Sequence, residues 1–265
     1  MGIKDGRLIA RQNEQRCLRA LHRFGWLRTR DLAALCWQHW ASRPSGPPGL
    51  GPTQPTGSAV RMAQRTLCRL RDARLVIAGQ GPDGAVIYAL SEGGARVVKE
   101  AGIAASSGKD LVRGFSSAHY RHRCISNQLA ISGMAQGFRV STEREVAQGL
   151  WLGGGIGIEG KRPDVLLRSR NQVWWVEVER SRKNAPEYKA LLRWLTKVLH
   201  DSTRRDGSRL LGPGYVWGRV IFVCAPAFAT KLRRDLQALG WTQQQVDALA
   251  WFESALYRFE ETLFP

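Results

Sequence analysis

The chain has 265 residues, of which 43% are hydrophobic, enough for buried cores in one large domain or two small ones. Its 40 Lys and Arg residues against 22 Asp and Glu residues give a net charge of +18, which favours nucleic acid as a partner. No run of about 18 apolar residues exists, which excludes a membrane-spanning helix, and the N-terminus lacks a secretory signal. We therefore expect a cytoplasmic protein without a membrane partner.

The first 40 residues predict two helices within Gln12–Trp40, separated near Gly25, with Thr29 as the N-cap of the second. The Pro/Gly-rich stretch 43–57 has no periodicity and predicts a flexible insert. Ser58 then begins a third helix that reaches Ala73. The polar face of this helix carries the candidate DNA-binding residues, Arg61, Gln64, Arg65 and Arg69.

A predicted hairpin over 75–90 and a short helix over 92–101 follow this basic helix. Two helices, a basic helix and a hairpin are the order of a winged helix-turn-helix, here over residues 1–101. Its third helix would enter the major groove, where Arg and Gln pair with guanine and adenine edges. The alternative is that the arginines form only a solvated helix face.

Residues 102–114 are small and predict a linker to a second domain over 115–265. A helix, three strands, a helix and a strand are predicted there in the order αβββαβ, the core of the restriction-endonuclease-like fold. The predicted class is therefore a two-domain α+β or α/β protein. Its elements are a helix over 117–136, a strand over 138–141, two strands around 164 and 173–179, a helix over 186–200 and a strand over 220–224; helices over 228–239 and 243–249 follow, and 251–261 is unassigned.

Acidic residues stand at the predicted ends of three successive strands. Asp164 begins one strand, Glu177 and Glu179 lie on one face of the next, and Glu143 ends the preceding one. Magnesium binds one or two carboxylates and leaves its other positions to water and phosphate. Asp164, Glu177 and Glu143 are therefore candidate ligands of Mg²⁺ or Mn²⁺, with Glu179 in the same acidic cluster.

Endonucleases of this fold place a Lys where this chain has Glu179. The positive charge would then come from Arg180, Arg182 or Lys183, and Lys183 joins Asp164, Glu177 and Glu179 as a catalytic candidate. The alternative is that these acids pair with nearby arginines and perform no chemistry.

Other chemistry-bearing residues have ordinary structural alternatives. His119 and His122 lie one turn apart and are candidates for a metal or a phosphate, or are ordinary helix residues. Tyr120 and Tyr188 are candidate nucleophiles, or packed tyrosines. Alternation along one strand predicts that Trp174 and its neighbour Trp175 face opposite sides.

A predicted winged helix ending in YALSEGGARVV, followed by VSTERE, RPDVLL and WWVEVERSRK, resembles the replication-relaxation family of bacterial mobile elements. The resemblance covers about residues 16–223, and that family is similar to MobC-type relaxases with a restriction-endonuclease-like site. It implies binding and nicking at an origin of transfer or replication, in plasmid mobilisation or conjugation within a relaxosome. It also implies that Asp164 and Glu177, with Glu143 and Glu179, hold the metal.

The sequence thus predicts a metal-dependent nickase or relaxase of the bacterial cytoplasm. Its partners would be double-stranded DNA, single-stranded DNA at the nicked site, and other relaxosome or replication proteins. The alternative is a non-catalytic accessory protein or repressor that binds DNA with a degenerate nuclease fold. Scattered single cysteines fit buried thiols in a reducing compartment: Cys17, Cys36, Cys68, Cys124 and Cys224.

Overall fold

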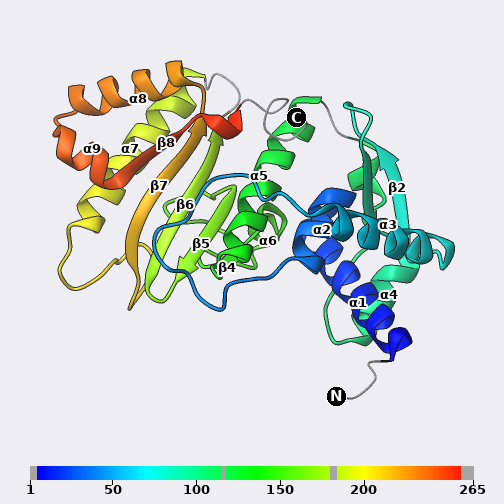
Figure 1. Cartoon of the computed structure of the whole chain (residues 1–265). Coiled ribbons are helices and arrows are strands. Elements are labelled where there is room, and N and C mark those ends of the chain that lie inside the picture. Colours follow the sequence, from blue (N-terminus) through cyan, green and yellow to red (C-terminus); the bar gives the residue numbers. More distant parts are fainter. Residues whose placement is uncertain (1–4, 115–116, 180–183, 258–265) are drawn as a thin grey trace. The chain divides into compact units, whose positions relative to one another are not determined.

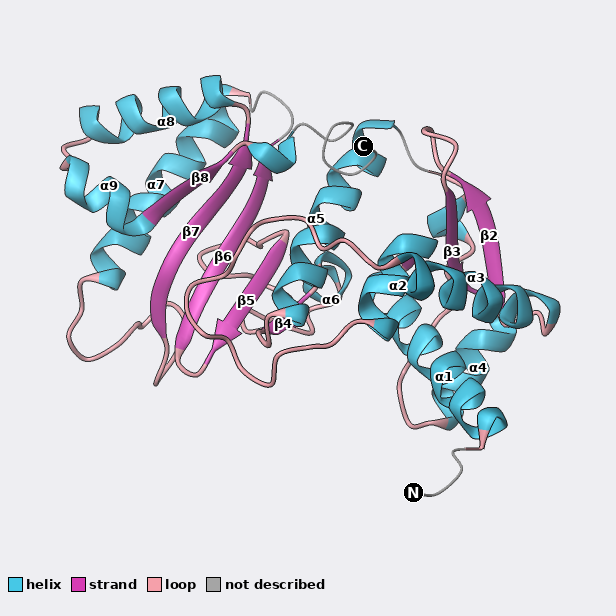
Figure 2. Cartoon of the chain, in the orientation of Figure 1, coloured by secondary structure: helices cyan, strands magenta, loops and turns pink. Residues whose placement is uncertain are grey.

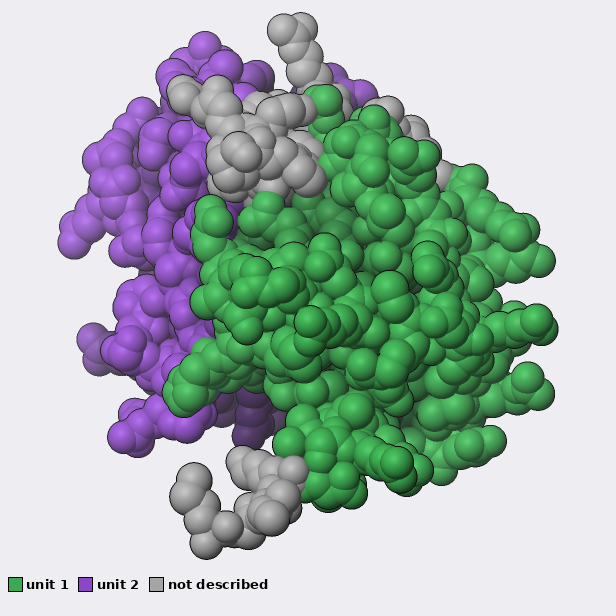
Figure 3. All heavy atoms as spheres, turned by 45° about the vertical axis from the view of Figure 1, so that its right-hand side comes forward, with its two compact units in different colours: residues 1–40, 53–131 green, residues 41–52, 132–265 purple. Residues whose placement is uncertain are grey.

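The computed structural model describes residues 5–114, 117–179 and 184–257, and it is a mixed α+β structure with two separate sheets (Figures 1 and 2). Two compact units divide the chain (Figure 3). The first contains Met1–Trp40 and Thr53–Ile131, and the second contains Ala41–Pro52 and Ser132–Pro265. This division differs from the expected boundary at 102–114, because it falls inside a helix and assigns part of the expected insert to the second unit.

The first unit combines helices with a three-stranded antiparallel sheet of order β1-β3-β2. Side-chain caps begin three of its described helices, where Asp5 accepts a hydrogen bond from the Arg7 backbone, Thr56 accepts one from Ala59 and Ser91 accepts one from Gly94. Its elements are α1 (Gly6–Phe24), β1 (Trp26–Arg28), α2 (Thr29–Trp37), α3 (Gly57–Asp72), β2 (Val76–Gln80), β3 (Val86–Leu90), α4 (Glu92–Glu100), the 3₁₀ turn η1 (Asp110–Val112) and most of α5 (Ser117–Ala135).

A buried ion pair begins α2. Thr29 is the first helical residue rather than the N-cap, and Arg28 occupies the cap position. The Arg28 guanidinium lies 2.9 Å from the Asp31 carboxylate, and both side chains are almost fully buried. Asp31 also accepts the Arg28 backbone N–H at 3.0 Å, so one carboxylate fixes both the strand end and the helix start.

The predicted linker is built into the first unit. Gly108 donates its backbone N–H to Leu90 at the end of β3, and Val112 of η1 packs over Gly79 of β2. A Cβ on Gly79 would lie 2.8 Å from the Val112 carbonyl oxygen, so only glycine permits this approach. Residues 108–112 are therefore part of the packing around the sheet.

The second unit contains a five-stranded sheet of order β4-β5-β6-β7-β8. The strands from β4 to β6 pair antiparallel, whereas β6, β7 and β8 pair parallel. A parallel pair needs a crossover connection, which here contains a helix between β6 and β7. The elements are β4 (Arg139–Ser141), α6 (Glu143–Ala147), β5 (Val165–Ser169), β6 (Gln172–Glu179), α7 (Ala185–Ser202), β7 (Val216–Cys224), α8 (Pro226–Ala238), α9 (Gln243–Leu249), β8 (Ala250–Glu253) and η2 (Ala255–Tyr257).

The two neighbouring tryptophans of β6 confirm the predicted alternation. Trp175 belongs to the core that α7, α8 and α9 form over one face of the sheet, with Trp194 at 4.7 Å between ring centroids. Trp174 instead packs edge-on against Phe138 at 5.2 Å. Both faces of β6 are thus covered, which explains why the strand is apolar without a break.

The expected insert is anchored in the second unit. Gly49 exchanges two hydrogen bonds with the Gln136 side chain, at 2.6 and 2.7 Å. Ser132 donates its hydroxyl hydrogen to the carbonyls of Gly49 and Gly51. These bonds hold the segment 41–52 in place of the flexible loop that its composition predicts.

None of the helices in the described ranges is long and apolar enough to cross a membrane. Four of the five cysteines are buried free thiols, as predicted, and Cys68 is exposed.

Candidate metal centre and nucleic-acid interface

The polar face of α3 presents all four predicted DNA-binding side chains to solvent: Arg61, Gln64, Arg65 and Arg69. Among these, Arg69 also donates from Nε to the Glu14 carboxylate of α1 at 2.8 Å. Phosphate contact by Arg69 would have to compete with this ion pair, so the basic face centres on the first two turns of α3.

The loop between β2 and β3 carries a carboxylate and no cation. Asp83 accepts a hydrogen bond from the Tyr120 hydroxyl at 2.9 Å, and the Tyr120 ring stacks on Trp26 at 5.4 Å. Burial raises the pKa of Tyr120, which makes this buried phenol a poor nucleophile. The loop is therefore held by packing, and its charge does not favour phosphate.

Asp164 lies immediately before β5 and beside the C-terminal half of β6. Its backbone N–H donates to the Val176 carbonyl at 2.9 Å, and its carboxylate accepts the Val178 backbone N–H at 2.6 Å. Antiparallel pairing of β5 with β6 brings the start of one strand to the end of the other. The structure thus brings together the two acids, Asp164 and Glu177, that the sequence pattern predicts at neighbouring strand ends.

Glu177 is a buried carboxylate with partners on both oxygens. Oε1 accepts the Trp175 indole N–H at 2.5 Å, and Oε2 lies 2.7 Å from the Lys161 ammonium. Burial raises the pKa of Glu177, the charges of Asp164 and Glu179 add to this, and Lys161 opposes it. Asp164 and Glu179 are therefore close enough to Glu177 to oppose its negative charge, whereas the Lys161 ammonium favours that charge.

Glu179 follows on the same face of β6 as Glu177 and is also buried, with 7% of its surface exposed. It is in register with Cys224 of β7, where burial first and the Glu179 charge second raise the pKa of the thiol to about 12. Glu179 therefore acts on the pKa of both Glu177 and Cys224.

Glu143 is the first residue of α6 and not the end of a strand. The sequence Thr-Glu-Arg-Glu is a capping box, in which Thr142 and Glu145 exchange hydrogen bonds, and this signal predicts a helix start. In the parts of the chain that the structure describes, no three acidic, His or Cys side chains are grouped to hold a metal. The predicted set of Asp164, Glu177 and Glu143 is therefore not assembled.

The donor set nevertheless suits a hard cation that binds two carboxylates. Asp164 and Glu177 supply oxygen ligands at one strand end, and Mg²⁺ usually takes its remaining ligands from water and phosphate. Asp164 and Glu179 add to the burial that raises the pKa of Glu177, and a divalent cation beside them would favour the charged carboxylate.

Lys161 is the site residue that sequence reasoning missed. It ends a Gly-rich loop and forms an isolated bridge with Ile158, and its ammonium also lies 5.6 Å from the Trp194 ring centroid. No spacing rule connects it to Glu177. The predicted sources of positive charge, Arg180, Arg182 and Lys183, lie outside the described residues.

Tyr188 packs against other side chains of the second unit, and the two histidines belong to the first unit. The Tyr188 hydroxyl donates to Asp235 at 3.0 Å, and the Lys231 ammonium lies 3.4 Å from its ring centroid, so it is a packed tyrosine. His119 is exposed and His122 is half-buried on α5.

Neither a family model, nor a curated protein, nor a solved structure matches this chain, so its function has to be argued from the geometry above.

Proposed function

We propose that the chain is a DNA-binding protein that nicks one strand with the help of Mg²⁺ or Mn²⁺. The observation that carries this proposal is the meeting of Asp164, Glu177 and Lys161 at the end of two adjacent strands. Two acids that hold a metal, with a lysine beside them, form one arrangement that can support metal-assisted hydrolysis of a phosphodiester. From α5 to β7 the order is αβββαβ apart from the short helix α6 between β4 and β5, and this order supports a restriction-endonuclease-like core around them.

In this proposal, Asp164 and Glu177 hold the metal, and Glu179 adds negative charge beside them. The bound metal would polarise the phosphate and lower the pKa of a water molecule. Lys161 supplies the positive charge that position 179 lacks, because its ammonium reaches Glu177 from a different part of the chain. That position lets it orient Glu177 and contact a phosphate oxygen next to the metal.

The first unit would deliver this centre to duplex DNA. Its order of two helices, a basic helix and a hairpin supports a winged helix-turn-helix, with Arg61, Gln64 and Arg65 toward the major groove. The charge of +18 adds sequence-independent attraction to phosphates. The resemblance to the replication-relaxation family implies that nicking takes place at an origin of transfer or replication, within a relaxosome.

A second candidate is a non-catalytic accessory protein or repressor that binds the same DNA. Both oxygens of Glu177 already have partners, and Glu177 and Glu179 are only 5% and 7% exposed. An ammonium bonded to a buried carboxylate also stabilises a fold without any metal. This candidate keeps the DNA contacts of α3 and loses cleavage.

Nicking of a supercoiled plasmid by the full chain separates the two candidates. We expect open-circular product in Mg²⁺ or Mn²⁺ and none with a chelator. The double substitution Asp164→Asn and Glu177→Gln keeps side-chain shape and removes both charges, so it should slow nicking by about 100-fold or more. Glu159→Gln, which removes an acid from an exposed pair with Lys197, is the matched control and should nick normally.

Equal nicking by the double variant would contradict the assignment of the centre. DNA binding without nicking, by the wild type and in every metal, would favour the accessory protein. Circular dichroism of each variant checks that lost activity is not lost folding.

A further inference from the structure

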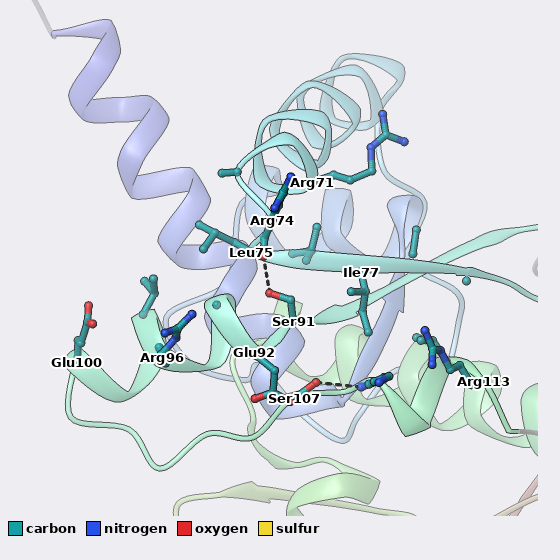
Figure 4. Close-up of a pocket in the computed structure, with 18 residues that line it drawn as sticks. Arg71, Arg74, Leu75, Ile77, Ser91, Glu92, Arg96, Glu100, Ser107 and Arg113 are labelled. Carbon is teal, nitrogen blue, oxygen red and sulfur yellow. Dashed lines mark hydrogen bonds between the residues drawn. The ribbon is translucent and has the colours of Figure 1, made fainter.

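A pocket of about 1060 Å³ lies in the first unit beside the outer edge of β2 (Figure 4). The end of α3, the strand β2, the helix α4 and the chain around η1 line it. Figure 4 shows the side chains of Arg74 and Arg96 on different walls, with Arg113 at the far end. Five lining cations outnumber two lining carboxylates: Arg71, Arg74, Arg96, Lys109 and Arg113.

One wall of the pocket is a strand edge with backbone groups to offer. The order β1-β3-β2 leaves β2 with a single neighbour. Leu75 accepts a backbone hydrogen bond from Ser91, so by alternation Ile77 and Gly79 turn their backbone groups toward β3. The backbone N–H and C=O groups of the strand's other residues, Val76, Ala78 and Gln80, point away from β3. Among the described residues, these groups bond to no other backbone group.

We propose that this pocket binds an extended acidic peptide of a partner protein, which adds a fourth strand to the sheet at β2. A peptide backbone offers N–H and C=O groups in the spacing that an open strand edge needs. The excess of cations around the edge attracts carboxylates, and Ile77, Val97 and Val112 offer apolar surface to alternate side chains. The pocket shares no lining residue with the proposed metal centre, and the proposal does not depend on cleavage.

A strand of nucleic acid fits the same pocket less well. Its phosphates accept hydrogen bonds and offer no donors to the open carbonyl groups of β2. Among the described residues, none of those that line the pocket is aromatic, so they offer unpaired bases no stacking platform. Glu92 and Glu100, which also line the pocket, would repel phosphates, whereas a peptide can place a neutral residue beside each.

Fluorescence anisotropy with the full chain tests the proposal. The probe is a labelled heptapeptide of alternating aspartate and valine, and the control peptide has the same side chains on an N-methylated backbone. We expect the first to bind and the second to fail. Arg96→Glu should weaken peptide binding by about fivefold or more. Arg11→Glu, at an exposed position of α1 and outside the pocket lining, should leave it unchanged.

Amide hydrogen exchange distinguishes the addition of a strand at β2 from binding by charge alone. Bound peptide should slow exchange at Val76, Ala78 and Gln80, whereas Ile77 and Gly79 already bond to β3 and serve as controls within one strand. Equal binding of the N-methylated peptide would overturn the proposal. So would displacement of the peptide by an equal concentration of single-stranded DNA, which would assign the pocket to nucleic acid. Absence of peptide binding up to about 1 mM would overturn it as well.

Discussion

Replacement of Lys161 by Met removes the ammonium that lies 2.7 Å from the buried carboxylate of Glu177. Loss of one partner from a buried ion pair costs about 3–5 kcal/mol, because the remaining charge stays buried and uncompensated. The Lys161 side chain is 20% exposed, so water screens the pair in part and the lower end of this range applies. We therefore expect Lys161→Met to destabilise the second unit by about 3 kcal/mol near neutral pH.

The cost should depend on pH in a stated direction. Burial already raises the pKa of Glu177, and Lys161 acts against that rise, so removal of Lys161 raises the pKa further. A carboxyl whose folded pKa exceeds its unfolded value stabilises the fold below the unfolded pKa and loses that contribution as pH rises through the folded pKa. Urea unfolding followed by circular dichroism should show a larger loss at about pH 8 than at about pH 5.

Two comparisons isolate the ion pair. Lys197→Met breaks the pair of Lys197 with Glu159, whose side chains are 59% and 37% exposed, and should cost under about 1 kcal/mol. Addition of Glu177→Gln to Lys161→Met removes the stranded charge and should recover most of the loss. The reasoning would be refuted if Lys161→Met cost no more than Lys197→Met, or if the second substitution recovered nothing.

Two further results are expected from other parts of the chain. Arg65→Ala should weaken duplex binding and lower the slope of log affinity against log salt by about 1. Arg69→Ala should change this slope less, because the Arg69 guanidinium is already bonded to Glu14 of α1. Anisotropy titrations at several salt concentrations measure both slopes. Burial acts to raise the pKa of Asp201, but hydrogen bonds from Ser208 and Trp217 lower it. The ionised Asp201 carboxylate should therefore stabilise the fold above its unfolded pKa of about 3.9, and this contribution should disappear as pH falls through the folded pKa. Asp201→Asn should lower the free energy of unfolding by about 1–3 kcal/mol, measured by urea unfolding.

Helical periodicity and caps predicted most of the helices well. The helix Gln243–Leu249 has the predicted bounds, and α5 ends one residue before the predicted end. The strand Trp26–Arg28 escaped prediction because three residues carry no periodicity, and its pairing with β3 is a tertiary event. The insert looked flexible for a similar reason, since the bonds that hold it come from α5, far along the chain.

The acidic part of the candidate site follows from local rules, whereas its lysine does not. Period-two alternation places Glu177 and Glu179 on one face, and the pairing of adjacent strands brings Asp164 beside them. Lys161 arrives through a Gly-rich loop in which Gly157 has a φ of +89°, a backbone conformation that sequence pattern does not predict in detail. A cation from a loop can replace one expected on a strand, and only tertiary structure reveals it.

The chain passes between its two units three times, at 40/41, 52/53 and 131/132. Gly49 leaves the ribosome 87 residues before its partner Gln136, a delay of about 4–17 s at ordinary rates of synthesis. The segment 41–52 therefore lacks the partner of Gly49 until the end of α5 has been made. A nascent chain stalled before α5 would leave this segment accessible to proteases and chaperones. Access to the segment would therefore report whether α5 has been synthesised.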